Sequence, residues 1–347
     1  MRDDRNSLAS LETGRPMDEL AEPSPTAIDW LSGLLGRGEA GISLALLALV
    51  FLITLNDLYR VGELRFATRG NLYIVSRQVA YVAIVALGVF FVILTSGIDL
   101  SIGSIVGLSG ILCGMAMVAG APWPLAIVAG LLAGGLIGSV NGAIVAWVGV
   151  APFIVTLAML GMARGLIFIL TRGDSIRAIP EPFIAFGQAD VLGIPMPVIV
   201  LILVAIASHI VLTYSVFGRR VYALGGNEKA TELSGINVRR VKFYTYVVSA
   251  VLSSVTGILY VARFRSAQAN SGLGLELDAI AAAVIGGASL MGGSGTVVGV
   301  LIGAMIMGVI RNGLVLMEVS SYWQDFIIGL VIVIAAIIDV LRNRRRA

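Results

Sequence analysis

The chain has 347 residues, of which 58% are hydrophobic and only 13% are charged. Soluble domains carry about 25% charged residues, so this composition excludes an ordinary soluble protein and favours a membrane protein with several helices of about 20 apolar residues. The net charge of +3 is small, and the basic residues gather in predicted loops and at the C-terminus, which indicates membrane orientation rather than nucleic-acid binding.

The first 38 residues are polar and contain seven acidic residues, and we expect them to form a largely disordered cytoplasmic tail. The remainder, residues 39–347, is predicted to be one membrane domain. Apolar runs predict an all-α, polytopic transmembrane helical bundle of about ten spans. The predicted helices cover 40–56, 74–95, 100–119, 123–148, 152–171, 196–215, 243–264, 276–290, 295–317 and 322–341.

The basic residues predict the orientation of these helices. With ten spans, both termini and the 216–242 loop share one side of the membrane, and that side holds fourteen basic residues against seven on the other. Cytoplasmic loops carry an excess of lysine and arginine. We therefore expect both termini and the 216–242 loop in the cytoplasm.

Glycines recur at every fourth position in two predicted helices. Residues four apart share a helix face, and glycine there lets two backbones approach closely, so we expect both stripes to be packing faces. GGLIGSVNGAIV at 134–145 resembles GVLIGAMIMGVI at 299–310, and SGIDLSIG at 96–103 resembles SGLGLELDAI at 271–280, which indicates a faint internal duplication. The expected packing glycines are Gly130, Gly134, Gly138, Gly142, Gly295, Gly299 and Gly303.

A polar segment, Thr95 to Gly103, joins two apolar runs and contains the carboxylate of Asp99. A carboxylate at membrane depth is costly and usually marks a pathway or a partner. At a cytoplasmic turn it can instead cap the following helix. Both interpretations stay open. The candidate translocation-pathway residues are Ser96, Asp99, Ser101, Asn141 and Thr156.

The 216–242 loop contains the signals of a short helix. Asn227 suits an N-cap, Glu228 suits the first turn, and Gly235 suits a C-terminal stop. We predict a cytoplasmic helix over 228–234 that lies across the membrane surface. The alternative is a solvated loop whose basic residues only fix the orientation.

Several function classes leave no motif in this chain. It contains no G-x-x-x-x-G-K-[ST] phosphate-binding loop, no H-E-x-x-H motif and no pair of cysteines, because Cys113 is the single cysteine. We therefore expect a protein that is not an enzyme, that has no nucleotide site of its own, and that uses no metal or other cofactor.

Five segments in order along the chain resemble the membrane permease subunits of bacterial ABC importers for monosaccharides, the ribose-permease type. They are SGIDLSIGSIVGLSG (96–110), NGAIVAWVGVAPFIVTLAMLGMARGL (141–166), GRRVYALGGNEKATELSGINVRRVKF (218–243), ELDAIAAAVIGGASLMGGSGTVVGVLIGA (276–304) and SSYWQDFIIGLVIVIAA (320–336). Each segment alone is glycine-rich and unspecific, whereas their order over nearly all of residues 70–345 is specific.

The resemblance implies a multi-pass protein of the bacterial inner membrane with three kinds of partner: a cytoplasmic ATP-binding cassette ATPase, a periplasmic sugar-binding protein and a second permease copy, identical or related. It also implies that residues 227–235 form the coupling helix, which sits in a cleft of the ATPase. The residues carried over are Asn227, Glu228, Lys229, Ala230, Thr231, Glu232, Leu233 and Gly235, flanked by Arg219 and Arg220.

The chain departs from the family pattern at two places. Thr231 and Glu232 stand where an alanine and a basic residue are expected, and Ser96 stands where a second glycine is frequent. The imported solute would be a pentose or hexose. The alternatives are another small polar solute, such as a furanose signal molecule, a polyol or a nucleoside, or an ion-coupled transporter that uses Asp99.

Overall fold

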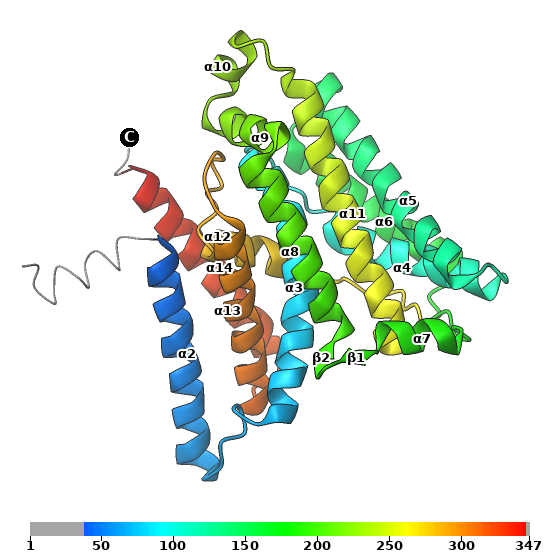
Figure 1. Cartoon of the computed structure of the whole chain (residues 1–347), viewed down its shortest axis with the longest axis vertical. Coiled ribbons are helices and arrows are strands. Elements are labelled where there is room, and N and C mark those ends of the chain that lie inside the picture. The colour runs from blue at the N-terminus through cyan, green and yellow to red at the C-terminus, as the bar shows by residue number, and fades with distance from the viewer. Residues whose placement is uncertain (1–37, 345–347) are drawn as a thin grey trace, which may run out of the picture.

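The computed structural model of this chain describes residues 38–344 (Figure 1). The predicted tail therefore lies outside the described residues, apart from Gly38, which begins the first helix. The elements are α2 (Gly38–Val61), α3 (Arg69–Leu94), α4 (Ile102–Val118), α5 (Trp123–Ala143) with a π-helical turn (Ile144–Val148), α6 (Pro152–Thr171), α7 (Glu181–Gly187), β1 (Asp190–Val191), β2 (Ile194–Pro195), α8 (Met196–Tyr214), α9 (Val216–Gly226), α10 (Glu228–Leu233), α11 (Val238–Phe264), α12 (Leu275–Ile285), α13 (Val297–Leu316) and α14 (Ser321–Arg344).

All ten predicted apolar helices are present, but not all are full spans. Seven of the described helices are long and apolar enough to cross a membrane. The apolar parts of α4 and α14 are shorter, and α12 has only 11 residues. The prediction for α12 extended to residue 290 and was wrong there, because Gly286 ends the helix and Gly287 adopts a positive φ of 88°.

Local side chains fix several helix starts. The side chains of Thr68, Ser215 and Thr296 each accept a hydrogen bond from a backbone N–H in the first turn of the helix that follows. Proline occupies the first turn of α5, α6 and α8, where its missing N–H costs nothing. The predicted starts of α5, α6 and α8 agree with the structure, whereas α3 and α11 begin five residues earlier than predicted and α9 was not predicted.

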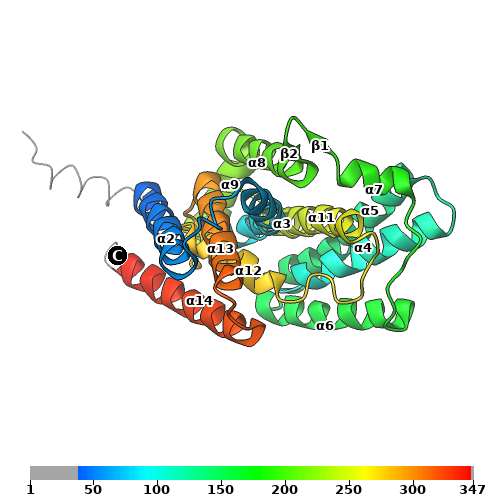
Figure 2. The same cartoon turned by 90° about the horizontal axis from the view of Figure 1, so that it is seen from below.

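The centre of the bundle is the antiparallel pair α3 and α11 (Figure 1). In the most apolar 18-residue stretch of α3, 89% of the residues are buried, whereas in that of α2 only 11% are buried. The helix α3 contacts α8, α11, α12 and α13, whereas α2 packs mainly on α13 at the edge seen in Figure 2. The sequence shows both as apolar runs, and only packing distinguishes the core helix from a lipid-facing one.

The packing follows a repeated scheme. The helices α4 and α5 pack on each other and both pack on α11, while α12 and α13 pack on each other and both pack on α3. Because α3 and α11 run in opposite directions, the two sets have inverted orientations. This exchange of partners is what an inverted duplication would produce, in agreement with the similar sequences in the two halves.

Candidate functional site

The predicted short helix in the loop is α10, one residue shorter than expected. Asn227 Oδ1 accepts a hydrogen bond from the N–H of Ala230 at 2.9 Å, which makes Asn227 its N-cap. Gly235 follows with a positive φ of 79°, and its N–H donates to the Glu232 carbonyl. The helix α9 (Val216–Gly226) was not predicted, and the alternative, a solvated segment whose basic residues only fix the orientation, stays open.

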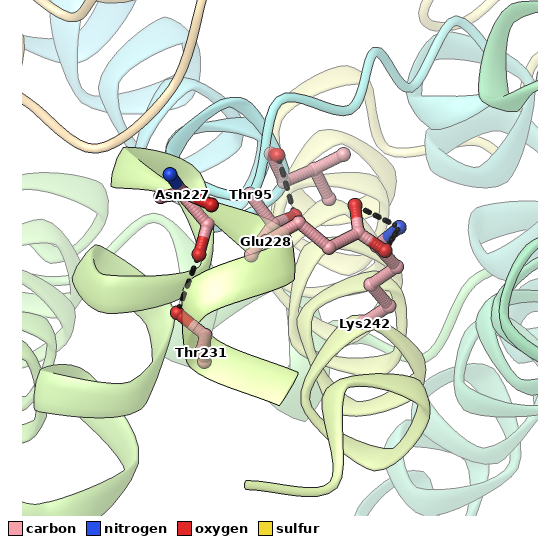
Figure 3. Close-up of polar contacts among 6 residues, drawn as sticks. Thr95, Asn227, Glu228, Thr231 and Lys242 are labelled. Atoms are coloured by element: carbon pink, nitrogen blue, oxygen red, sulfur yellow. Dashed lines mark hydrogen bonds and ion pairs between the residues drawn. The ribbon is translucent and has the colours of Figure 1, made fainter. Parts of the chain in front are cut away.

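The helix α10 projects from one end of the molecule and exposes nearly all of its surface (Figure 1). Lys229, Ala230 and Glu232 are exposed, and Leu233 is 80% exposed. Glu228 forms an ion pair with Lys242 of α11 at 2.8 Å, which fixes α10 against the first turns of that helix (Figure 3). A short rigid helix with an exposed leucine is suited to docking into another protein.

The two unusual residues of α10 have different environments. Thr231 is the one buried residue of this helix, and its hydroxyl donates to the Asn227 carbonyl at 2.8 Å (Figure 3). Glu232 is exposed, so its negative charge lies at the surface. Arg219 and Arg220, on α9, are also exposed. The threonine therefore belongs to the buried face of the helix, and the glutamate belongs to the exposed surface.

The C-terminal end of α9 meets two other segments at a glycine junction, which consists of Gly225, Leu94 at the end of α3, and Gly293 in the loop between α12 and α13. The Gly293 N–H donates to the Leu94 carbonyl at 3.0 Å. A Cβ atom at Gly225 would overlap both the Leu94 carbonyl oxygen and the Gly293 nitrogen, whereas one at Gly226 would meet nothing. Only glycine permits this approach at position 225.

Two side chains tie the same segments together. The Tyr222 hydroxyl, on α9, donates to the Gly295 carbonyl at 3.0 Å, and burial raises the pKa of this phenol, so it keeps its proton. Ser96 adopts a positive φ of 59° and donates from Oγ to the Met291 carbonyl at 2.7 Å. A glycine at position 96 would adopt this φ more easily, but it could not make that hydrogen bond.

Asp99 lies in the extended segment between α3 and α4 and is completely buried. Its Oδ1 accepts hydrogen bonds from the N–H and the hydroxyl of Ser101, at 3.0 and 2.6 Å, and its Oδ2 accepts one from the Ser249 hydroxyl of α11 at 3.0 Å. Asp99 is not the N-cap of α4, since Ser101 occupies that position and makes no side-chain cap. The carboxylate instead links the α3–α4 segment to α11.

The other candidate pathway residues extend this buried network. The Asn141 amide donates to Ser101 Oγ at 2.9 Å, and the Thr156 hydroxyl contacts the carbonyls of Pro152 and Ile98, at 3.0 and 3.3 Å. Asn141 Oδ1 and the Tyr246 hydroxyl are buried without a partner among the described residues. Of the five candidates only Ser96 is exposed, so in this conformation the other four line no open passage.

The predicted packing glycines lie at close helix contacts. On α5, a Cβ at Gly138 would come within 2.6 Å of the Tyr246 carbonyl of α11, and Gly134 and Gly142 face the same helix. Gly130 lies against both α4 and α11. Gly299 and Gly303 lie against the backbone of α12. Gly295 also lies in a tight contact, beside the ring of Phe90, but it precedes α13 with a φ of 137° and so is not on the helix face, as had been predicted.

Sequence reasoning missed Tyr222, Tyr246 and the glycine junction. Their roles depend on contacts between segments more than 65 positions apart, and the sequence gives no signal for such contacts. No group of three or more metal-ligating side chains occurs within the described range 38–344.

Residues 71–336 match the protein family described as "Branched-chain amino acid transport system / permease component". The chain belongs to this permease family. It is thus a transport component and a multi-pass membrane protein. No solved structure was found that matches this chain.

Three relatives illustrate what the chain is similar to. It is 42% identical to the ribose import permease protein RbsC of Escherichia coli K12, an alignment that covers 84% of this chain and 92% of RbsC. It is 38% identical to the D-allose transport system permease protein AlsC of E. coli K12, over 80% of this chain and 86% of AlsC. It is 35% identical to the L-arabinose ABC transporter permease protein AraH of Azospirillum brasilense, over 81% and 84%.

Proposed function

We propose that this chain is the permease subunit of an ATP-driven importer of a monosaccharide, a pentose or hexose, in the bacterial inner membrane. The single observation that carries the coupling part of the proposal is α10, a capped helix that projects from one end of a membrane bundle with its side chains exposed. The relatives that transport ribose, D-allose and L-arabinose support a monosaccharide as the solute.

In this proposal α10 and the exposed Arg219 and Arg220 dock on a cytoplasmic ATP-binding cassette ATPase, which hydrolyses the ATP. A binding protein delivers the sugar to the opposite face. The basic residues around α10 support its cytoplasmic location. The same argument supports a cytoplasmic location for both termini.

The glycine junction would carry a displacement of α10 into the bundle. The helix α10 follows α9 directly after Asn227, and α9 contacts both Leu94 and Gly293 at its C-terminal end. Leu94 is the last residue of α3, immediately before the segment that contains Ser96 and Asp99. Movement of the ATPase would therefore reach the buried network of Asp99, Ser101 and Asn141 through backbone contacts, without flexible side chains between them.

We further propose that the Asp99 network closes the pathway in this conformation. Among residues 38–344 its carboxylate has no cationic partner, and it depends on the N–H and hydroxyl of Ser101, the N-cap of α4, and on the Ser249 hydroxyl of α11. Displacement of the α3–α4 segment would break the Ser249 bond and expose polar groups to the solute. The neighbouring Asn141 and Thr156 then become part of the pathway wall.

A second permease copy would pack against α6. Only 28% of the residues in the most apolar 18-residue stretch of α6 are buried. Gly161 and Gly165, four residues apart, have open space beside them. Small residues at this spacing allow close helix association in lipid. The helices α6 and α14 lie along one edge of the bundle (Figure 2). Met162, 59% exposed on this face, is the position to test, since a cysteine there should cross-link two copies in a Cys113→Ser background.

Reconstitution tests the function. In liposomes the chain alone should show neither ATPase activity nor uphill sugar uptake, and addition of the ATPase and the binding protein should produce both. Uphill uptake by the chain alone under a proton gradient would contradict the proposal and favour an ion-coupled transporter. ATP-driven uptake of a nucleoside or polyol, with no monosaccharide transported, would support the ATP-driven importer but contradict a monosaccharide as its solute.

A further inference from the structure

A polar cavity of about 200 Å³ lies at the end of the bundle opposite α9 and α10. We call it the outer polar cavity. Gln78 of α3, Tyr260 of α11, Leu273 in the loop before α12, Asp278 of α12 and Arg311 of α13 line it. Because α3 and α11 belong to different halves of the repeated packing scheme, the cavity lies where the two halves meet, beside the short helix α12.

The charges of this cavity cancel each other. Arg311 Nε and Nη2 donate to the two carboxylate oxygens of Asp278, at 2.9 and 2.8 Å. Asp278 is only 5% exposed, so the pair is held firmly in the wall of the cavity. Arg311 cannot attract an anionic ligand strongly, because Asp278 already neutralises its charge. Asp278 likewise cannot attract a cationic ligand strongly, because its carboxylate is paired with Arg311. The site therefore favours an uncharged ligand.

Hydrogen-bonding capacity nevertheless remains around the cavity. Among the described residues, the side-chain amide of Gln78, the hydroxyl of Tyr260 and Nη1 of Arg311 make no hydrogen bond. Val82, Leu273 and Leu275 supply apolar wall beside them. Pockets for small ligands combine apolar walls with a few convergent polar groups. Hydrogen-bond donors and acceptors together with aliphatic wall suit the hydroxyl groups and the C–H face of a sugar ring.

We propose that the outer polar cavity is a binding site for one uncharged monosaccharide. The inference rests on the proposed import function and adds the place where the solute is received. Gln78 and Arg311 Nη1 donate to ring hydroxyls, and the Gln78 carbonyl and the Tyr260 hydroxyl accept from them. The Asp278–Arg311 pair positions Arg311 and keeps charged solutes out.

Protection from chemical labelling tests the site directly. Leu273, 62% exposed at the cavity, is replaced by cysteine in a Cys113→Ser background, and the full chain in lipid nanodiscs is labelled with a maleimide. D-ribose, D-allose and L-arabinose are the probes. At least one should slow labelling of Leu273→Cys and leave the control Leu192→Cys, at a 97% exposed position of the β1–β2 turn, unaffected. Equal labelling with and without all three sugars would overturn the proposal.

A second variant identifies the cavity as the cause. Gln78→Leu keeps the size of the side chain and removes its amide, so protection at Leu273→Cys should need about 2- to 10-fold more sugar. Ser76→Ala is the matched control, because Ser76 Oγ donates to the Tyr73 carbonyl of its own helix. Unchanged protection in Gln78→Leu would place the sugar elsewhere and refute this site. Loss of ATP-driven uptake in the wild-type complex would instead refute the import function, so the two failures are distinguishable.

Discussion

Substitution of one glycine in the last turn of α9 should uncouple this transporter, while the same change at the next residue should not. In Gly225→Ala the new methyl group overlaps the Leu94 carbonyl oxygen and the Gly293 nitrogen, both of which are backbone atoms that cannot rotate away. In Gly226→Ala it meets no atom. Neither glycine has a positive φ, so the alanine backbone itself is unstrained at both sites.

The difference between the two variants isolates the overlap. Both substitutions gain a similar helix propensity, about 1 kcal/mol relative to glycine, and this gain cancels in the comparison. Overpacking in a tight contact costs about 1–3 kcal/mol. If that cost falls on the state in which α9 rests on α3 and the α12–α13 loop, the population of that state falls by about 5- to 150-fold relative to Gly226→Ala.

The assay measures ATPase activity and sugar uptake on the same proteoliposomes, made with the ATPase and the binding protein. Gly225→Ala should insert normally and still bind the ATPase, because the exposed surface of α10 is unchanged. Its ATP-driven uptake should fall, together with the stimulation of ATPase activity by the binding protein. Full coupled uptake in Gly225→Ala, equal to that of Gly226→Ala, would show that the glycine junction transmits nothing.

Four further predictions follow from other contacts. Glu228→Arg replaces the ion pair with Lys242 by a repulsion and puts a positive charge at the N-terminus of α10, which costs about 0.3–1 kcal/mol of helix stability. ATP-driven uptake should therefore drop while membrane insertion stays normal. Unchanged uptake would mean that α10 only fixes the orientation of the chain in the membrane. Gly138→Leu forces a large side chain against the Tyr246 carbonyl, so the yield of folded protein should fall sharply. A yield equal to that of the wild type would mean that this face of α5 does not pack on α11. Ser249→Ala removes one donor to the buried Asp99 carboxylate and should destabilise the closed conformation by about 1–3 kcal/mol, seen as a lower thermal unfolding midpoint; an unchanged midpoint would argue against a structural role for that bond. Cysteines at Lys229 and Arg177 in a Cys113→Ser background should react with a membrane-impermeant reagent from opposite sides, and reaction of position 229 from outside intact cells would reverse the orientation.

Local sequence signals were sufficient for the class of protein and for most of the elements. Long apolar runs require helices in lipid, because every backbone N–H and C=O must be paired within its own segment. Proline and capping residues then mark where helices begin, as Thr296 does for α13. The short helix α10 was predictable for the same reason, since Asn227 and Gly235 act on residues three or four positions away.

Contacts between distant segments were decided by the tertiary structure. Both α2 and α3 read as apolar runs, yet one lies at the edge of the bundle and the other at its centre, because burial depends on neighbours that the sequence does not reveal. Asp99 was recognisable as unusual, but its hydrogen bond to Ser249 depends on a helix 150 positions away. Glycine spacing predicted close packing on α5 and α13. The requirement for glycine at position 225 arises only where α9, α3 and the α12–α13 loop meet.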